Sequence, residues 1–570
     1  MRLAAFSTVV IVAACATSGA KTGTSPAGGY DLVISHARIV DGTGNPWFFG
    51  DVGVKGDRIA RLAPDGALAR ASAAQHVDAK GMVLAPGFID IQGQSDDELL
   101  RTDGRVISKI TQGVTTEILG EGGTPAPVND KILALFGPED SSYVRIVKAF
   151  EGPHGFGNWL EAMEKHGNSI NVGSFLGAET IRVYAKGAAM GAPTPAEHDT
   201  MRAVTVRAMQ DGAFGIASAL IYPPGAYAGT EELVAEAQAM APYHGVYITH
   251  MRSEENLFLE AIDEALAIGK RGGVPVEIYH FKAAGPRNWY KAPLAIAKID
   301  SARAAGQDVG ATMYPYNASG NGLSACLPQW ASENGKLLTN LKDSTIRARI
   351  VREAVDSSPQ AADLCQSVGP DRIMVVGMTT DAYKKYNGWR LDKIASDMHQ
   401  PWGDALVTLV VAENGRPGKI TFSMKEENVS LQLARPWVVI GTDAGGSNPD
   451  SSAQLVHPRG YGSYPKILGR YVREQHLLTL EDAVRKMSSA VAARLSLFDR
   501  GIIREGMFAD LVLFDPATII DNATYEKPHQ VSTGVIDVWV NGVAVVRDTK
   551  VTGAKPGVAL RGPGWTGTIP

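Results

Sequence analysis

Eight short apolar runs, separated by longer amphipathic segments, are the feature of this sequence that most restricts its fold. The runs lie at 83–90, 114–120, 170–177, 212–221, 246–250, 274–280, 309–316 and 436–442. Alternation of short buried strands with helices is typical of βα units around a parallel sheet. Helices are expected after Thr230 as an N-cap, and over 255–270 before a glycine pair. Eight such units predict an α/β fold, a (β/α)8 barrel of the TIM type, over residues 83–495.

Two β-rich pieces flank this region, one near each end of the chain. Residues 30–82 and 496–570 alternate apolar and polar side chains between Asn and Gly turns, as short strands do. We expect them to pair into one small β-sandwich domain. The gap at 317–435 is too long for a βα loop, and it predicts a subdomain inserted within the barrel.

The first 29 residues are predicted to be a signal peptide and a flexible tether. Arg2 precedes an apolar run at 3–12, which has signal-peptide length and is too short to span a bilayer. The segment 12–15 resembles a bacterial lipobox, so we expect export to the periplasm and a lipid anchor at the outer membrane through Cys15. The small-x-small pattern at 14–16 also fits ordinary cleavage, which leaves a soluble exported form open.

Charge and cysteine content exclude some partners and leave one question open. The chain has 60 acidic and 55 basic residues, a net charge of −5 and no basic block, so nucleic acid is not an expected partner. Besides Cys15 the chain has Cys326 and Cys365, which are not at metal-ligand spacing. An oxidising compartment allows them to pair, and two buried thiols fit the sequence equally well.

Polar residues follow several of the predicted strands. They are Asp90, Gln92 and Gln94 after the first, Glu121 after the second, His250 after the fifth, His280 and Lys282 after the sixth, and Asp443 after the eighth. In a TIM-type barrel, catalytic groups lie at these strand ends. A single histidine there is usually structural. Two histidines with two carboxylates are the ligand types of a catalytic zinc that keeps one position for water.

Several ordered motifs carry a resemblance to a known family. They are APGFID, QGVTTEILGEG, LIYPPGAYAGTEEL, ITHMRSE, HFK, YPY, GTDAGG, HPRGYG and GIIREGMFADLVLFDP. From about residue 30 to the C-terminus the chain resembles the amidohydrolase superfamily, and within it the D-aminoacylases (N-acyl-D-amino-acid deacylases). The resemblance implies the same barrel and β-sandwich that the periodicity predicts.

The resemblance implies a zinc site with one departure from the family pattern. In D-aminoacylases a residue after the second strand, usually cysteine, holds zinc with the histidines of strands five and six; here these are Glu121, His250 and His280. Family members usually carry His-x-His after the first strand, where this chain has Gln92 and Gln94. Amide oxygens are weak zinc ligands, so we expect one tightly bound Zn²⁺ and a doubtful second site.

The family pattern also implies which residues handle the substrate. Lys282, Tyr222 and Arg459 are expected near the carboxylate of a small N-acyl amino acid or short peptide, which a cation or a phenol suits. Asp443 is expected to act as the general base, taking a proton from the attacking water and returning it to the leaving nitrogen.

The leading hypothesis is therefore zinc-dependent hydrolysis of the amide bond in N-acyl-D-amino acids or similar blocked D-residues. A dipeptidase or cyclic-amidase activity on the same scaffold is an alternative, because fold and metal do not determine the acyl group. A non-catalytic binding protein is a third, motivated by Gln92 and Gln94. Retention of His250, His280 and Asp443 argues against this third alternative.

The anchor at Cys15 can be tested by fractionation. If the lipobox is functional, Cys15→Ser should move the protein from the membrane fraction to the soluble periplasm or leave it unprocessed. A processed variant that fractionates as the wild type does would contradict the anchor.

Overall fold

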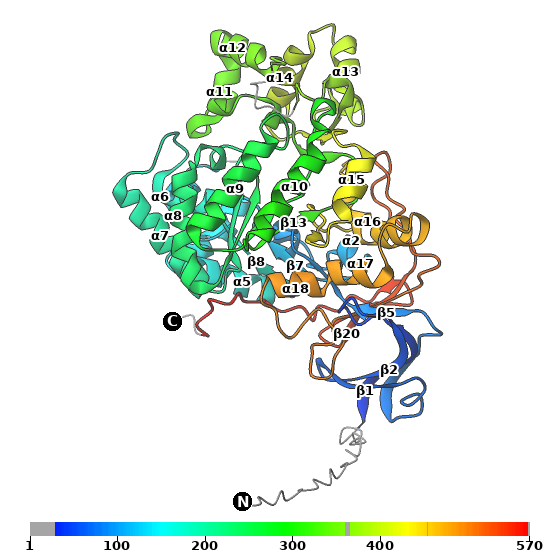
Figure 1. Ribbon diagram of the computed structural model, residues 1–570. Helices are drawn as coiled ribbons and strands as arrows, with labels where there is room; N and C mark the ends of the chain where they lie inside the picture. Colours follow the sequence, from blue (N-terminus) through cyan, green and yellow to red (C-terminus); the bar gives the residue numbers. More distant parts are fainter. Residues whose placement is uncertain (1–28, 138–139, 359–364, 453, 568–570) are drawn as a thin grey trace, which may run out of the picture.

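A computed structural model describes residues 29–137, 140–358, 365–452 and 454–567. The expected signal peptide and Cys15 lie outside these residues. The chain forms a central α/β body, a β-rich sheet at the end where the described chain begins, and a helical lobe on the opposite side (Figure 1).

The central body contains two parallel sheets that together supply eight strand positions. The first sheet contains β6 (Phe88–Asp90), β7 (Val114–Leu119) and β8 (Asn171–Ser174). The second contains β9 (Leu176–Gly177), β10 (Gly215–Ala219), β11 (Val246–His250), β12 (Val276–Ile278), β13 (Val309–Met313) and β17 (Val438–Ile440). Only Phe175 separates β8 from β9, and a parallel bridge between Gly93 and Ala444 joins the other two edges. The predicted (β/α)8 architecture is confirmed.

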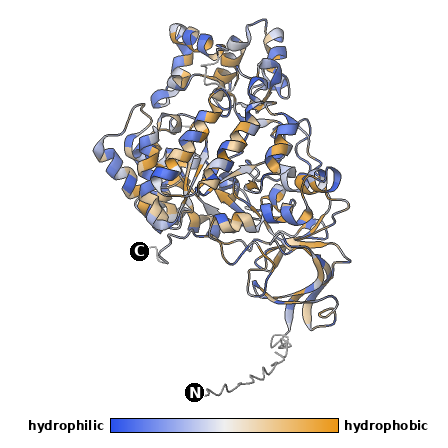
Figure 2. Cartoon of the chain, in the orientation of Figure 1, coloured by the Kyte–Doolittle hydropathy of each residue, from blue (hydrophilic) through white to orange (hydrophobic). Residues whose placement is uncertain are grey.

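Amphipathic helices surround these strands and bury their apolar faces against them (Figures 1 and 2). The principal ones are α5 (Gly155–His166), α6 (Ala178–Lys186), α7 (Pro195–Gln210), α8 (Thr230–Met240), α9 (Phe258–Gly272), α10 (Lys291–Ala304), α15 (Glu426–Leu433), α16 (Arg459–Lys466), α17 (Leu480–Met487) and α18 (Ser489–Arg494). Gly273 caps the end of α9, and its φ of +72° is the left-handed conformation that glycine allows. Thr230 is the first residue of α8 rather than its cap: Gly229 caps the helix, and the Thr230 hydroxyl donates to Glu264.

Both ends of the chain build the β-rich sheet, as predicted. Its nine strands are β1 (Tyr30–Ile39), β2 (Phe48–Lys55), β3 (Arg58–Pro64), β4 (Ala73–Asp78), β5 (Val83–Pro86), β18 (Leu511–Phe514), β19 (Val535–Val540), β20 (Val543–Arg547) and β21 (Lys550–Val551). The run 83–90, predicted as one barrel strand, is two strands. The chain changes sheets at Gly87, whose N–H donates to Asp510, while the next N–H, of Phe88, donates to Gly113.

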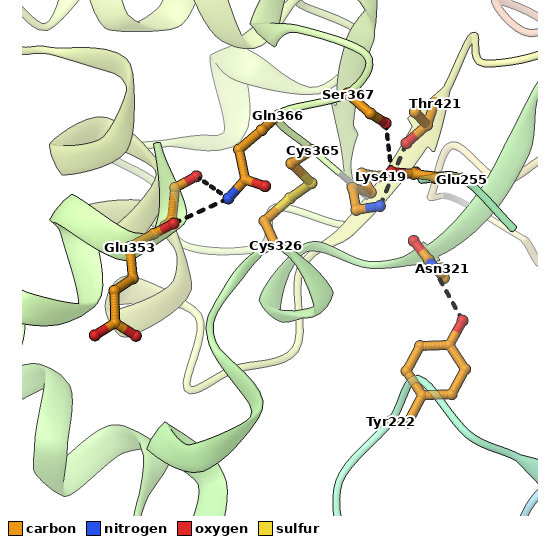
Figure 3. Close-up of a disulfide and its surroundings, with 11 residues drawn as sticks. Tyr222, Glu255, Asn321, Cys326, Glu353, Cys365, Gln366, Ser367, Lys419 and Thr421 are labelled. Atoms are coloured by element: carbon orange, nitrogen blue, oxygen red, sulfur yellow. Dashed lines mark hydrogen bonds between the residues drawn. A yellow bond between two sulfur atoms is a disulfide. The ribbon is translucent and has the colours of Figure 1, made fainter. Parts of the chain in front are cut away.

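The insertion forms the helical lobe. It contains α11 (Leu337–Lys342), α12 (Ser344–Ala354), α13 (Leu391–Asp397) and α14 (Trp402–Ala412), with a small sheet of β14 (Ser319–Gly322), β15 (Ile373–Val376) and β16 (Gly418–Thr421). The lobe has its own apolar core, and a disulfide joins Cys326 to Cys365 (Figure 3). The disulfide answers the question that the sequence left open. Helix α15, within the predicted insertion at 317–435, instead packs on α10 and β17 of the barrel.

The remaining α-helices of the described residues are α1 (Asp96–Arg101), α2 (Ile107–Ile110), α3 (Asp130–Leu133) and α4 (Ser141–Val147), and a π-helical turn at Ile467–Glu474 follows α16. Among the helices described, none is long and apolar enough to span a membrane.

Candidate active site

Glu121, His250 and His280 converge at the carboxyl ends of the barrel strands. Oε1 of Glu121 lies 3.1 Å from Nδ1 of His250 and 3.1 Å from Nε2 of His280, and the two ring nitrogens are 2.8 Å apart. Zinc bonds of about 2.0–2.1 Å in a tetrahedral site place neighbouring ligand atoms about 3.3 Å apart. The three residues named from the sequence therefore have the donor types and the spacing that a zinc ion requires.

Local backbone conformation directs these side chains inward. His250 is the last residue of β11, and Glu121 follows Gly120 just after β7. Gly120 has a φ of +108°, and a Cβ there would lie 2.4 Å from the carbonyl oxygen of Phe175, so only glycine fits. His280 and Asp443 have φ values of 33° and 53°, a left-handed conformation that is uncommon outside glycine and concentrates at functional sites.

Burial and mutual contact shift the pKa values of the triad. Burial raises the pKa of Glu121, but hydrogen bonds from His250 and His280 outweigh it and hold that pKa well below its usual range. Burial and the neighbouring His280 lower the pKa of His250. The cluster therefore favours an ionised carboxylate beside an uncharged His250 imidazole, the states in which they bind a metal.

Glu254 is a functional residue that the sequence analysis missed. Its Oε1 lies 2.7 Å from Nδ1 of His280 and 2.6 Å from Nζ of Lys282. A carboxylate on the second nitrogen of a ligating histidine orients the ring and makes it a stronger donor. Burial lowers the pKa of His280, as does Lys282, but Glu254 and other carboxylates outweigh them and raise it to about 9. The sequence offered one indication of this role, because Glu254 is the last residue of the motif ITHMRSE, which contains His250.

Gln92 and Gln94 turn their amide groups toward the two carboxylates of the site. Nε2 of Gln92 donates to Oε2 of Glu121 at 2.8 Å, and Nε2 of Gln94 donates to Oδ1 of Asp443 at 2.9 Å. Oε1 of Gln92 accepts a hydrogen bond from Thr312 at 2.7 Å. The position of the family's His-x-His pair is thus filled by hydrogen-bond donors.

Asp443 lies across the same cavity and is paired with Arg459. Nη1 of Arg459 donates to Oδ2 of Asp443 at 2.5 Å. Nη2 of the same guanidinium donates to the carbonyl oxygen of Gly320 at 2.9 Å. Burial raises the pKa of Asp443 to about 7, although Arg459 opposes the shift. A carboxyl group with a pKa near 7 is suited to accept and return a proton at neutral pH.

A fully buried lysine lies directly beneath these groups, and sequence reasoning did not identify it. Nζ of Lys109 contacts Asp90 at 2.7 Å, Glu117 at 3.0 Å and the hydroxyl of Thr442 at 2.6 Å. Burial lowers the pKa of Lys109, but Asp90 and Glu117 outweigh burial and raise it. Because these partners come from β6, from β7 and from the segment just after β17, the ammonium joins three neighbouring parts of the barrel.

The predicted substrate residues lie around a cavity of about 190 Å³ in which the metal-binding triad is exposed. Tyr222 and Lys282 line it, and the Tyr222 hydroxyl accepts a hydrogen bond from Asn321 at 3.0 Å (Figure 3). Arg459 lies behind Asp443, in the wall of a neighbouring cavity. Its Nε is buried without a hydrogen-bond partner among the described residues. The structure brings all seven predicted site residues to one barrel mouth.

Two histidines and a carboxylate at the strand ends of an eight-stranded barrel define a metal-dependent hydrolase site. A model of the amidohydrolase family matches residues 340–546. A D-aminoacylase of Alcaligenes xylosoxydans xylosoxydans is 33% identical over 545 residues, which cover 93% of this chain and 97% of the relative.

Solved structures agree with this match. An N-acyl-D-glutamate deacylase from Bordetella bronchiseptica, bound to zinc and a phosphonate mimic of the tetrahedral intermediate, gives a TM-score of 0.75 at 30% identity over 93% of this chain and 99% of that one. A D-aminoacylase with a binuclear metal centre, in which one metal activates and the second attenuates, gives a TM-score of 0.76 at 31% identity. That match covers 93% of this chain and 100% of the other. The chain belongs to the D-aminoacylase family of the amidohydrolase superfamily.

Metal retention should distinguish the triad from the glutamines. The purified protein should carry about one zinc per chain. Glu121→Ala removes one of three convergent donors and should abolish retention, whereas Gln92→Ala should leave most of the zinc bound. Elemental analysis after dialysis measures both. Two tightly held metals in the wild type would show that Gln92 and Gln94 act as ligands.

Proposed function

We propose that this protein hydrolyses the amide bond of N-acyl-D-amino acids in a zinc-dependent reaction. The observation that carries the proposal is the convergence of Glu121, His250 and His280 opposite Asp443 in one cavity. The D-aminoacylase and the N-acyl-D-glutamate deacylase described above support the choice of substrate class, as does an N-acyl-D-aspartate deacylase.

Each residue of the cavity has a part in this proposal. A bound zinc supplies a Lewis acid for the scissile carbonyl and for the attacking water. Asp443 takes a proton from that water and delivers it to the leaving nitrogen, while Arg459 and Gln94 hold its carboxylate in position. Lys282 and Tyr222, which line the cavity, attract the substrate carboxylate.

We further propose that a single zinc suffices. Glutamine amides replace the ring nitrogens that a second metal would need as ligands, and their N–H groups donate to Glu121 and Asp443. The relative described as activated by one metal supports this interpretation.

The decisive experiment is turnover of matched N-acetyl-D and N-acetyl-L amino acids, with and without prior removal of the metal by a chelator. We expect hydrolysis of D-substrates, loss of activity on chelation and recovery with zinc. Equal turnover of the L-series would contradict the proposed selectivity. Absence of turnover in every case would favour a binding protein.

Asp443→Asn tests the general base. Asparagine keeps the size and polarity of the side chain but cannot accept the proton, so kcat should fall by about 10²–10⁴ while zinc content stays unchanged. Loss of zinc would instead make Asp443 a ligand. Nearly full activity would place the base elsewhere.

We also propose that the protein is exported and anchored through Cys15. The disulfide between Cys326 and Cys365 supports export, because disulfides persist in oxidising compartments such as the periplasm.

A further inference from the structure

Glu179 is an acidic residue in the wall of the active-site cavity, and neither the sequence motifs nor the proposed reaction uses it. It lies in the first turn of α6, after the third barrel strand. A Cβ added at Gly123 would lie 3.9 Å from its Cδ, and one added at Gly225 would lie 3.6 Å from its Oε2, which places the carboxyl group between these glycines. Within the described chain, its side chain has no hydrogen bond and no ion pair. Burial raises the pKa of Glu179 to about 7.

Glu179 lies on one side of the cavity, and Lys282 and Asp443 lie on another. Glu179, Gly122, Gly123 and Ala219 belong to the ends of strands two to four, whereas Lys282 and Asp443 follow strands six and eight. In a ring of eight strands, positions two to four face positions six to eight across the barrel mouth, and Glu121, His250 and His280 line the same cavity. A substrate bound with its carboxylate at Lys282 and its amide bond at the triad would then extend its acyl group toward Glu179.

A second cavity, of about 360 Å³, adjoins the first and shares Gly123 and Glu179 in its wall. Apolar side chains make up much of its lining: Val128, Ile132, Leu135, Phe136, Tyr143 and Val183. Asp96 also lines it, with one carboxyl oxygen buried and unpartnered in the described part of the chain. An acyl group that reaches Glu179 thus has an apolar space beside it.

We infer that Glu179 binds the protonated α-amine of an aminoacyl group, so that this enzyme takes dipeptides with an apolar N-terminal residue and a C-terminal D-residue. A carboxylate in a partly dry site forms a charge-assisted hydrogen bond with an ammonium group, and the neighbouring cavity accepts the apolar side chain. This inference rests on the proposed function and specifies the acyl group of the substrate. The reaction remains a hydrolysis: water adds its oxygen to the carbonyl carbon, the C–N bond breaks, and the leaving nitrogen of the D-residue takes a proton.

Two substrates that differ only in the amine test this inference. L-leucyl-D-leucine and N-(4-methylpentanoyl)-D-leucine have the same carbon skeleton, and the second lacks the α-amine. We expect kcat/KM of the wild-type holoenzyme to be at least about tenfold higher for the dipeptide. Glu179→Gln should remove most of this preference, by lowering dipeptide turnover while leaving the 4-methylpentanoyl substrate nearly unaffected.

Matched controls accompany the variant. Glu260→Gln changes an exposed glutamate in the first turn of α9 and should leave both rates unchanged. Glycyl-D-leucine, which has no side chain for the apolar cavity, should be a poorer substrate than the leucyl compound. Turnover of the 4-methylpentanoyl substrate and the zinc content report whether Glu179→Gln is folded.

The outcomes separate this inference from the proposed function. Hydrolysis of both substrates without preference, or a preference that survives in Glu179→Gln, contradicts the role of Glu179 and leaves the deacylase activity intact. If the wild type hydrolyses neither compound nor any N-acetyl-D-amino acid, the proposed function itself is wrong. The comparison in the wild type needs no variant, so a misfolded Glu179→Gln would not prevent the test.

Discussion

The buried ammonium of Lys109 is the interaction on which the geometry of this site depends most. It is shielded from solvent and contacts Asp90 and Glu117, together with the Thr442 hydroxyl and the Ala444 carbonyl. These groups come from the strands on both sides of the seam between β6 and β17, where the two parallel sheets meet. Breaking a buried ion pair by removing one partner typically costs about 3–5 kcal/mol, because the remaining charge is left without compensation. The contacts of this one cation therefore hold in register the segments that present Gln92, Glu121 and Asp443.

Above this seam, charges are distributed so that each catalytic group has a defined partner. Glu121 faces two imidazoles, His280 is supported by Glu254, and Asp443 is held between Arg459 and Gln94. In a site of low polarity such pairing is needed, since an isolated buried charge would shift its pKa and become neutral. Glu179 departs from this pattern, and its lack of a partner among the described residues is the reason for assigning it a ligand.

The inserted lobe contributes to the site through the strand nearest the barrel, β14, rather than through its helices. Strand β14 supplies Ser319, Gly320 and Asn321 to the cavity wall, and Asn321 donates to Tyr222 of the barrel (Figure 3). Cys326 lies only four residues after Gly322, so its disulfide to Cys365 restrains the segment that leaves the cavity. A cross-link of this kind limits the conformations open to the loop between its ends.

The sequence by itself determined the fold class and most of the metal site, because both are expressed in local patterns. Period and length of the apolar runs indicate βα units, and the polar residue at a strand end must lie at the barrel mouth whatever the details of packing. His250, His280, Glu121 and Asp443 could therefore be named. Only the tertiary structure decided which side chains pair across the barrel. Lys109 and Glu179 lie on helices, and nothing in their local sequence distinguishes them from ordinary surface charges. Segments far apart in the chain bury both residues and supply the contacts of Lys109. Distant segments also pair Cys326 with Cys365 and determine the change of sheet at Gly87.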